Sequence, residues 1–264
     1  MQDKEIAELE KIVQEKTYVA FADVLGYRSI LLGSGIEKDY SRLKYLLDLW
    51  ESLGQAISAA NGRIPGVESV FFSDSFFLKS DDLGYLINFL VEVMVENYCY
   101  YEITDDRWMP WIRCGIAFDW MVEFKDLSVA GLLKDEKFAY RNPAGPAVAN
   151  AYILSEKLGF KGMRILLPQQ LYAEAWMSAK RSTTGNAFID KANLLLGKKS
   201  WPESCDNHGE LVYDIPWWWC IDDGLPPDRI IKRHEWQVGI AGKPEEARLH
   251  YDKTVELLQL ASED

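Results

Sequence analysis

TYVAFADVLG, residues 17–26, is an apolar run that contains a single carboxylate, Asp23. A second apolar run, VESVFFSDSFFL at residues 67–78, contains Asp74 in the same way. Both runs are rich in β-branched and aromatic residues, so they are predicted to be strands, the second one a hairpin that turns at Ser73 and Asp74. An unpaired carboxylate in an apolar setting is costly, and each aspartate therefore needs a reason to be there.

The flanking sequence predicts how these strands are arranged. Helical spacing of apolar residues is found at 2–16, from 39 to about 60, and at 83–101, 144–159, 169–181 and 244–262. Further strands are predicted at 111–124, 164–168 and 211–221. This order of elements matches the split βαβ, ferredoxin-like layout of an α+β protein, an antiparallel or mixed sheet backed by helices. In that layout the strand with Asp23 and the hairpin with Asp74 are neighbours.

Composition narrows the function classes. The chain has 264 residues, 48% of them hydrophobic, and a net charge of −12, which disfavours broad binding to nucleic acid. We find no signal peptide and no apolar run long enough to span a membrane, and we expect a cytoplasmic protein. The four cysteines and three histidines lack metal-binding spacing, and no Rossmann, P-loop or α/β-hydrolase motif is present.

Two neighbouring aspartates allow two interpretations. Close carboxylates cannot both stay ionised without cations, and oxygen ligands suit Mg²⁺ or Mn²⁺, so the pair can hold the two ions used in phosphoryl or nucleotidyl displacement. The alternative is that Asp23 and Asp74 are ordinary turn residues at the ends of strands.

Four motifs occur in the order found in one enzyme family. FADVLGY (21–27), FFSDSFF (71–77), WIRCGIA (111–117) and GPAVANAYILSE (145–156) resemble signatures of the class III nucleotide cyclases. The resemblance covers residues 17–167 and implies a cyclase catalytic domain there. It leaves an N-terminal helix at 1–16 and a C-terminal extension at 168–264 that we expect to pack on the same domain.

The resemblance implies roles for individual residues. Asp23 and Asp74 would bind two Mn²⁺ or Mg²⁺ ions, with the backbone carbonyl of Val24 as a further ligand. Arg113 would pair with the β and γ phosphates of a nucleoside triphosphate; the alternative is a surface arginine on an edge strand. The residues implied to lie under the phosphates are Leu25, Gly26 and Tyr27.

Other positions depart from the purine cyclases of that family. Val70 and Asn142 stand where those enzymes carry the lysine and aspartate that read the base, and an asparagine amide can face a different base edge. The positions of the transition-state asparagine and arginine hold Ala149 and Ile153. The aromatic side chains that could lie against a base are Tyr45 and Phe72.

With these departures the chain resembles the pyrimidine cyclases of Pycsar anti-phage defence systems. That resemblance implies a homodimer with active sites at its interface, which converts UTP or CTP to cyclic UMP or cyclic CMP; we favour UTP. A catalytically silent nucleotide-binding regulator is the alternative, although intact Asp23 and Asp74 are hard to explain in a pseudoenzyme.

The last third of the chain, outside the resemblance, is rich in tryptophan. A platform for stacking single-stranded nucleic acid is conceivable there, but the acidic chain favours a core or dimer-packing role. The residues concerned are Trp201, Trp217, Trp218, Trp219 and Trp236.

Overall fold

The computed structural model of the chain describes residues 3–25, 27, 39–72, 74–99, 111–123, 142–157, 159–179, 201–205, 211–215, 217 and 245–260. Its strands are β1 (Lys16–Val24), β2 (Glu68–Phe72), β3 (Ser75–Ser80), β4 (Ile112–Trp120), β5 (Val122–Glu123), β6 (Pro143–Ala144), β7 (Arg164–Pro168), β8 (Trp201–Cys205) and β9 (Leu211–Asp214). Its helices are α1 (Asp3–Gln14), α3 (Asp39–Arg63), α4 (Leu83–Cys99), α6 (Pro146–Tyr152), the π-helix η2 (Ile153–Lys157), α7 (Gln169–Ala179) and α10 (Glu245–Leu260).

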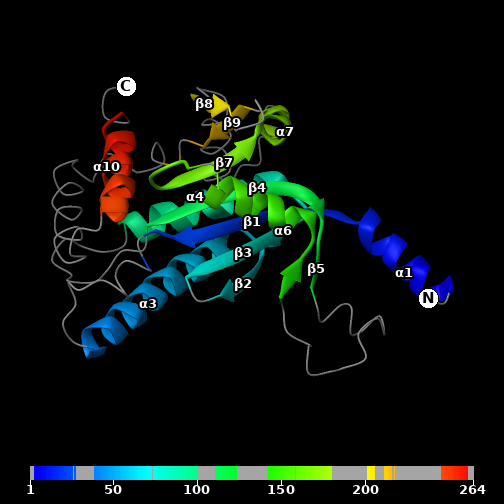
Figure 1. The fold of residues 1–264 in the computed structure, drawn as a ribbon, viewed down its shortest axis with the longest axis horizontal. Coiled ribbons are helices and arrows are strands. Elements are labelled where there is room, and N and C mark those ends of the chain that lie inside the picture. The colour runs from blue at the N-terminus through cyan, green and yellow to red at the C-terminus, as the bar shows by residue number, and fades with distance from the viewer. Residues whose placement is uncertain are drawn as a thin grey trace.

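A seven-stranded sheet forms the centre of the molecule, in the order β2-β3-β1-β4-β7-β9-β8 (Figure 1). Its first four strands are antiparallel, β7 runs parallel to β4, and β9 and β8 continue the same sheet antiparallel. The predicted ferredoxin-like α+β fold is confirmed, including the hairpin β2–β3 next to β1. A separate two-stranded ribbon joins β5 to β6.

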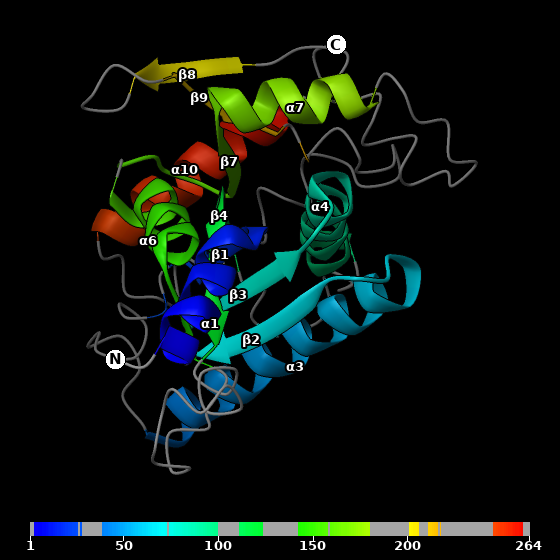
Figure 2. The same ribbon diagram turned by 90° about the vertical axis from the view of Figure 1, so that its right-hand side faces the viewer.

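The two faces of the sheet are covered differently. Helices α3 and α4 lie on one side and α6 on the other (Figure 2). Alternate β1 residues Ala20 and Ala22 face the large core under α3 and α4, whereas Val19 and Phe21 belong to a smaller cluster under α6. This alternation is the period of two expected of a strand buried on both faces, and it places Asp23 on the α6 face.

Several predicted boundaries differ from the structure. The helix expected to end near residue 60 continues through Asn61 and Gly62 to Arg63, because Ile64 still donates to the carbonyl of Ala60 at 2.8 Å and sits in the core. The helix expected at 144–159 is α-helical only to Tyr152 and then widens into a π-helix. Strand β8 was not predicted, since the alternation in WPESC is weak.

Two findings bear on the predicted helices and tryptophans. Helix α4, at one of the stretches predicted to be helical, has residues in the main core along its length, and Trp217 is fully buried in the same core. Within the described residues, no helix combines the length and apolar character that a membrane span requires.

Candidate functional site

Asp23 and Asp74 lie side by side at one end of the sheet. Asp23 is the next-to-last residue of β1 and pairs with Ser75, the first residue of β3. The amide of Val24 donates to the carbonyl of Asp74 at 2.9 Å, which ties the turn of the hairpin to the end of β1. The prediction that the two strands bring these aspartates together is confirmed, and both residues are half-buried.

A row of paired residues crosses the sheet at this level. Phe72 pairs with Ser75, Ser75 with Asp23, Asp23 with Arg113, and Arg113 with Arg164. Paired residues on neighbouring strands point to the same face. The row therefore places an aromatic ring, a carboxylate and two guanidinium groups in sequence along the face that α6 covers in part.

Arg113 is buried at the centre of this row. It lies on β4 between β1 and β7, so the alternative of a surface arginine on an edge strand is wrong. Its Nη1 donates to the carbonyl of Phe160 at 2.7 Å, and its Nη2 forms an ion pair with Glu156. Its buried Nε finds no hydrogen-bond acceptor among the described residues, which leaves one donor of the guanidinium unmatched.

The surroundings of Asp23 disfavour the ionised form of its carboxyl group. Burial, together with the nearby carboxylates of Glu156 and Asp74, raises the pKa of Asp23 from its ordinary 3.8 to about 8 against the opposing effect of Arg113. Asp23 also hydrogen-bonds with Glu156. Asp23 thus lies near two other carboxylates and one guanidinium, and its position favours a proton or a bound cation.

Glu156 is the site residue that the sequence analysis missed. It lies on η2, where the wider turn and the close approach of this segment to Gly115 set its position. A Cβ on Gly115 would lie 2.4 Å from the carbonyl oxygen of Ala151 and 2.6 Å from Cβ of Leu154. Ser155 Oγ also donates to the carbonyl of Arg113 at 3.2 Å. The glycine of the WIRCGIA motif therefore allows η2 to carry Glu156 to Arg113.

The residues predicted to lie under the phosphates are only partly described. The amide of Leu25 donates to the carbonyl of Trp111 at 2.7 Å, and its buried side chain belongs to the main core. Tyr27 is half-buried and packs against that core. Gly26 lies outside the described residues, and the phosphate-binding role of all three stays a prediction.

The base-reading candidates fall at different distances from the aspartates. Val70 and Phe72 lie on β2, two strands from β1, and the Phe72 ring stands 5.4 Å from that of Phe77, which in turn stands 5.0 Å from that of Phe21. Phe72 thus shares the row of Asp23.

The other two candidates are less well placed. Asn142 is exposed and directly precedes β6. Tyr45 lies on α3, and its side chain falls outside the described part of the chain.

The donor set fits hard divalent cations. Asp23 and Asp74 offer carboxylate oxygens on adjacent strand ends, and their mutual repulsion is relieved when a cation binds. Within the described ranges, no three His, Cys, Asp or Glu side chains gather as a metal-binding group. A cation held by the two aspartates would complete its coordination with backbone oxygen, water or oxygens of a bound ligand.

The fold occurs in solved nucleotide cyclase domains. The guanylyl cyclase domain of the RhoGC fusion protein from the aquatic fungus Blastocladiella emersonii is 15% identical, with a TM-score of 0.50 over 76% of this chain and 94% of that one. The guanylyl cyclase Cya2 is 12% identical, with a TM-score of 0.51 over 76% of this chain and 92% of that one.

A bacterial light-regulated adenylyl cyclase is 11% identical, with a TM-score of 0.50 over 85% of this chain and 57% of that one. No protein-family model and no curated protein sequence matches the chain. The chain therefore has the fold of a class III cyclase catalytic domain, as its motifs predict.

Proposed function

We propose that this protein is a nucleotidyl cyclase that converts a pyrimidine nucleoside triphosphate, UTP in preference, to the 3′,5′-cyclic monophosphate and diphosphate. The observation that carries the proposal is the placement of Asp23 against Asp74 at adjacent strand ends, on a cyclase fold and next to a buried arginine. Turn residues with no binding role would not need to share their end of the sheet with Glu156 and Arg113.

The reaction needs no protein nucleophile. The ribose 3′-oxygen loses its proton and forms a bond to the α-phosphorus, while the bond from the α-phosphorus to the bridging oxygen breaks and diphosphate leaves. Two Mg²⁺ or Mn²⁺ ions held by Asp23 and Asp74 would supply the positive charge that favours the 3′-alkoxide and the leaving diphosphate. Val24 would add its carbonyl to this ligand set.

The arginine and the strand ends would orient the substrate. Arg113 is always charged and its Nε is unmatched, so it can donate to a phosphate oxygen without losing its bond to Phe160. Leu25, Gly26 and Tyr27 would bring the backbone beneath the phosphates. Holding the 3′-oxygen in line with the α-phosphorus is the principal contribution expected from the protein.

The preference for a pyrimidine rests on the departures from the purine readers. Val70 lacks the charged amine that reads the base in the purine cyclases, and the Asn142 amide offers both N–H donors and an oxygen acceptor. Phe72 lies in the row of Asp23 and can contact a small planar base. The resemblance to Pycsar cyclases extends the proposal to a second messenger, cyclic UMP, in anti-phage defence, made by a homodimer.

The direct test is to incubate the purified protein with each of the four ribonucleoside triphosphates and Mn²⁺ or Mg²⁺. We expect cyclic UMP and an equal amount of diphosphate from UTP. Cyclic CMP as the main product would change the substrate to CTP within the same proposal. Absence of product from every nucleotide, with nucleotide binding retained, would favour the catalytically silent regulator. The sequence observation in favour of that alternative is that Ala149 and Ile153 replace the transition-state asparagine and arginine of the family.

A further inference from the structure

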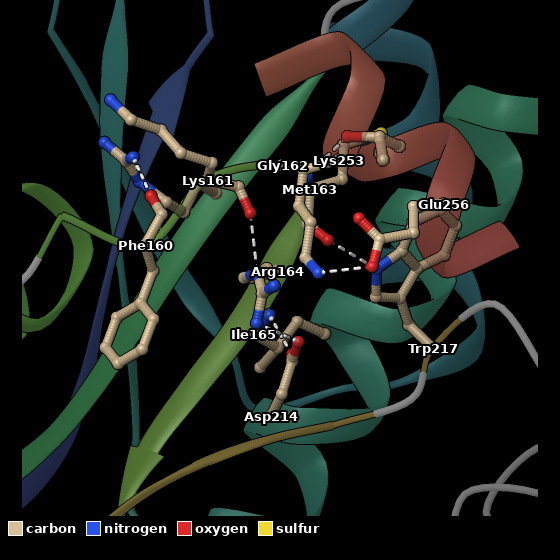
Figure 3. Close-up of polar contacts among 12 residues, drawn as sticks. Phe160, Lys161, Gly162, Met163, Arg164, Ile165, Asp214, Trp217, Lys253 and Glu256 are labelled. Carbon is tan, nitrogen blue, oxygen red and sulfur yellow. Dashed lines mark hydrogen bonds and ion pairs between the residues drawn. The ribbon is translucent and has the colours of Figure 1, made fainter. Parts of the chain in front are cut away.

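The segment from Phe160 to Ile165, here called the 160–165 segment, connects the C-terminal part of the chain to Arg113. Figure 3 shows its polar contacts with neighbouring elements. At its start, the carbonyl of Phe160 accepts the hydrogen bond from Arg113, and the carbonyl of Lys161 accepts one from Arg164 Nε at 2.6 Å. The backbone of this segment thus orients two guanidinium groups of the row that contains Asp23.

Helix α10 holds the middle of the segment by two side chains. Met163 donates its amide to Thr254 Oγ1 at 2.8 Å, and Gly162 donates its amide to His250 Nδ1 at 3.3 Å. Thr254 is fully buried, and its hydroxyl also donates to the backbone carbonyl of His250 within the helix. Gly162 has φ +90°, and a Cβ there would lie 3.1 Å from the Thr254 amide nitrogen, so the segment follows the helix surface closely.

Strand β9 and its continuation hold the other end. Trp217 Nε1 donates to the carbonyl of Met163 at 3.1 Å, and Ile165 donates its amide to Asp214 Oδ1 at 3.2 Å. Asp214 also forms a buried ion pair with Arg164, with 3.1 Å between Oδ2 and Nη1. The segment is therefore fixed from both sides by residues outside the motifs that resemble cyclases.

The contact between Arg113 and Phe160 differs in kind from that between Arg113 and Glu156. A phosphate group is an anion and competes with the Glu156 carboxylate for the guanidinium. It does not compete in the same way with a neutral carbonyl that is fixed in the backbone. The Phe160 carbonyl is thus the contact able to keep the guanidinium oriented while a phosphate binds.

We propose that helix α10 positions Arg113 for phosphate binding, with Thr254 and His250 acting through the 160–165 segment. The proposal rests on the phosphate-binding role proposed for Arg113. The charge of Arg113 also contributes, after burial, to the lowered pKa of His250, which places the helix within electrostatic reach of that guanidinium. In this account the C-terminal extension is a positioning element of the site.

The test uses the full-length protein and inorganic tripolyphosphate with Mg²⁺ as the probe, because that anion tests phosphate binding without requiring turnover. Thr254→Val removes the hydroxyl at nearly constant volume, and Thr254→Ser retains it. Asp252→Ala changes an exposed residue of the same helix and is the matched control. Calorimetry gives the affinity for tripolyphosphate, and ¹⁵N NMR of the Arg113 Nε–H reports the environment of the guanidinium.

We expect Thr254→Val, which removes the acceptor for the Met163 amide, to weaken tripolyphosphate binding by up to about tenfold, the equivalent of one hydrogen bond, and to shift the Arg113 signal. Thr254→Ser should restore both, and Asp252→Ala should change neither. Unchanged affinity and an unchanged Arg113 signal in folded Thr254→Val would overturn the proposal, as would equal losses in the Val and Ser variants. A wild-type protein that binds tripolyphosphate but cyclises no nucleotide would contradict the proposed function alone.

If Thr254→Val does not fold, His250 offers a second comparison. His250→Leu removes the acceptor for the Gly162 amide, whereas His250→Asn places an amide oxygen near the position of Nδ1. The account predicts weaker tripolyphosphate binding and a shifted Arg113 signal in the Leu variant, with recovery in the Asn variant. The same loss in both variants would contradict it.

Discussion

The surroundings of Asp23 and the 160–165 segment are neighbouring polar regions, since Arg113 donates to the Phe160 carbonyl. The two regions differ in how their charges are balanced. Around Asp23 the carboxylates of Glu156 and Asp74 lie near one guanidinium, the pKa of Asp23 is raised to about 8, and the Nε of Arg113 is unmatched among the described residues. Along the 160–165 segment the polar groups described above have partners, as in the buried pair of Arg164 and Asp214. Unmatched charge is suited to a ligand, and matched charge is suited to holding a structure.

The difference assigns separate tasks to the two regions. Substitutions in the 160–165 segment and its partners should reduce the free energy of unfolding, since they leave buried groups without partners. Substitutions of the aspartates should reduce ligand binding and turnover, and some of them should stabilise the protein. The predictions that follow test this division.

The largest loss of stability is expected from Asp214→Ala. The substitution leaves the guanidinium of Arg164 buried without its carboxylate and the Ile165 amide without its acceptor. We expect the free energy of unfolding to fall by about 3–5 kcal/mol, the usual effect of breaking a buried ion pair on one side. Urea denaturation measures it, and a loss below about 1 kcal/mol would show that the pair is dispensable.

A smaller loss of stability is expected from Gly115→Val. This substitution tests the close contact between β4 and η2 that places Glu156 next to Arg113. The new side chain would overlap the backbone of Ala151 and Ser155, so we expect a loss of about 3 kcal/mol and a weakened site. Gly54→Ala is the matched control, because nothing lies within 4 Å of the added Cβ on helix α3 and alanine favours helix by about 1 kcal/mol. Equal effects of the two substitutions would refute the role given to Gly115.

A gain in stability is expected from Asp23→Asn in the absence of metal. The folded protein keeps a proton on Asp23 that the unfolded chain releases above its ordinary pKa of 3.8, so stability falls as the pH rises from there to about 8. The asparagine has no such proton, and we expect the variant to be about 2 kcal/mol more stable than the wild type near pH 5, with a difference that grows up to about pH 8.

Thermal unfolding across this pH range measures the difference, and Mn²⁺ should raise the melting temperature of the wild type but not of Asp23→Asn. A variant that is less stable than the wild type at pH 8, or equally stabilised by Mn²⁺, would contradict the placement of Asp23.

The smallest effect is expected from His250, and it has the opposite sign. Burial, Arg113 and Lys161 lower the pKa of His250 from its ordinary 6.5 to about 3. Below pH 6.5 the unfolded chain binds a proton that the folded chain excludes, so stability is lost as the pH falls towards 3. At pH 6 we expect this loss to be about 1 kcal/mol relative to His250→Asn, with no relative change above pH 7. A constant difference at all pH values would show that His250 titrates normally.

Much of the fold could be predicted from local patterns. Apolar runs with period two, a tight hairpin at Asp74 and long helical stretches gave the order of elements, and that order has few compatible sheet arrangements. The neighbourhood of Asp23 and Asp74 followed from this order. The row from Phe72 to Arg164 was not predicted, because strand register depends on the actual pairing.

The rest of the site depends on contacts that no local pattern reports. The contact between Arg113 and Glu156 requires the π-helix, which departs from the 3.6-residue period by which helices are predicted. It also requires the absence of a side chain at Gly115. The bonds of Thr254 and His250 to the 160–165 segment join positions about ninety residues apart. A single threonine and a single histidine in a helical pattern do not indicate that they bind a distant segment of the chain.

The central claim is that Asp23 and Asp74 together bind the cations for nucleotide cyclisation, and Asp74→Ala tests it most directly. The measurement is the rate of cyclic nucleotide formation from UTP and from CTP with Mn²⁺, beside Mn²⁺ binding and thermal unfolding of the same preparations. The account predicts a loss of at least about 10³-fold in turnover, weakened Mn²⁺ binding and an intact fold. Unchanged turnover in a folded Asp74→Ala variant would contradict it.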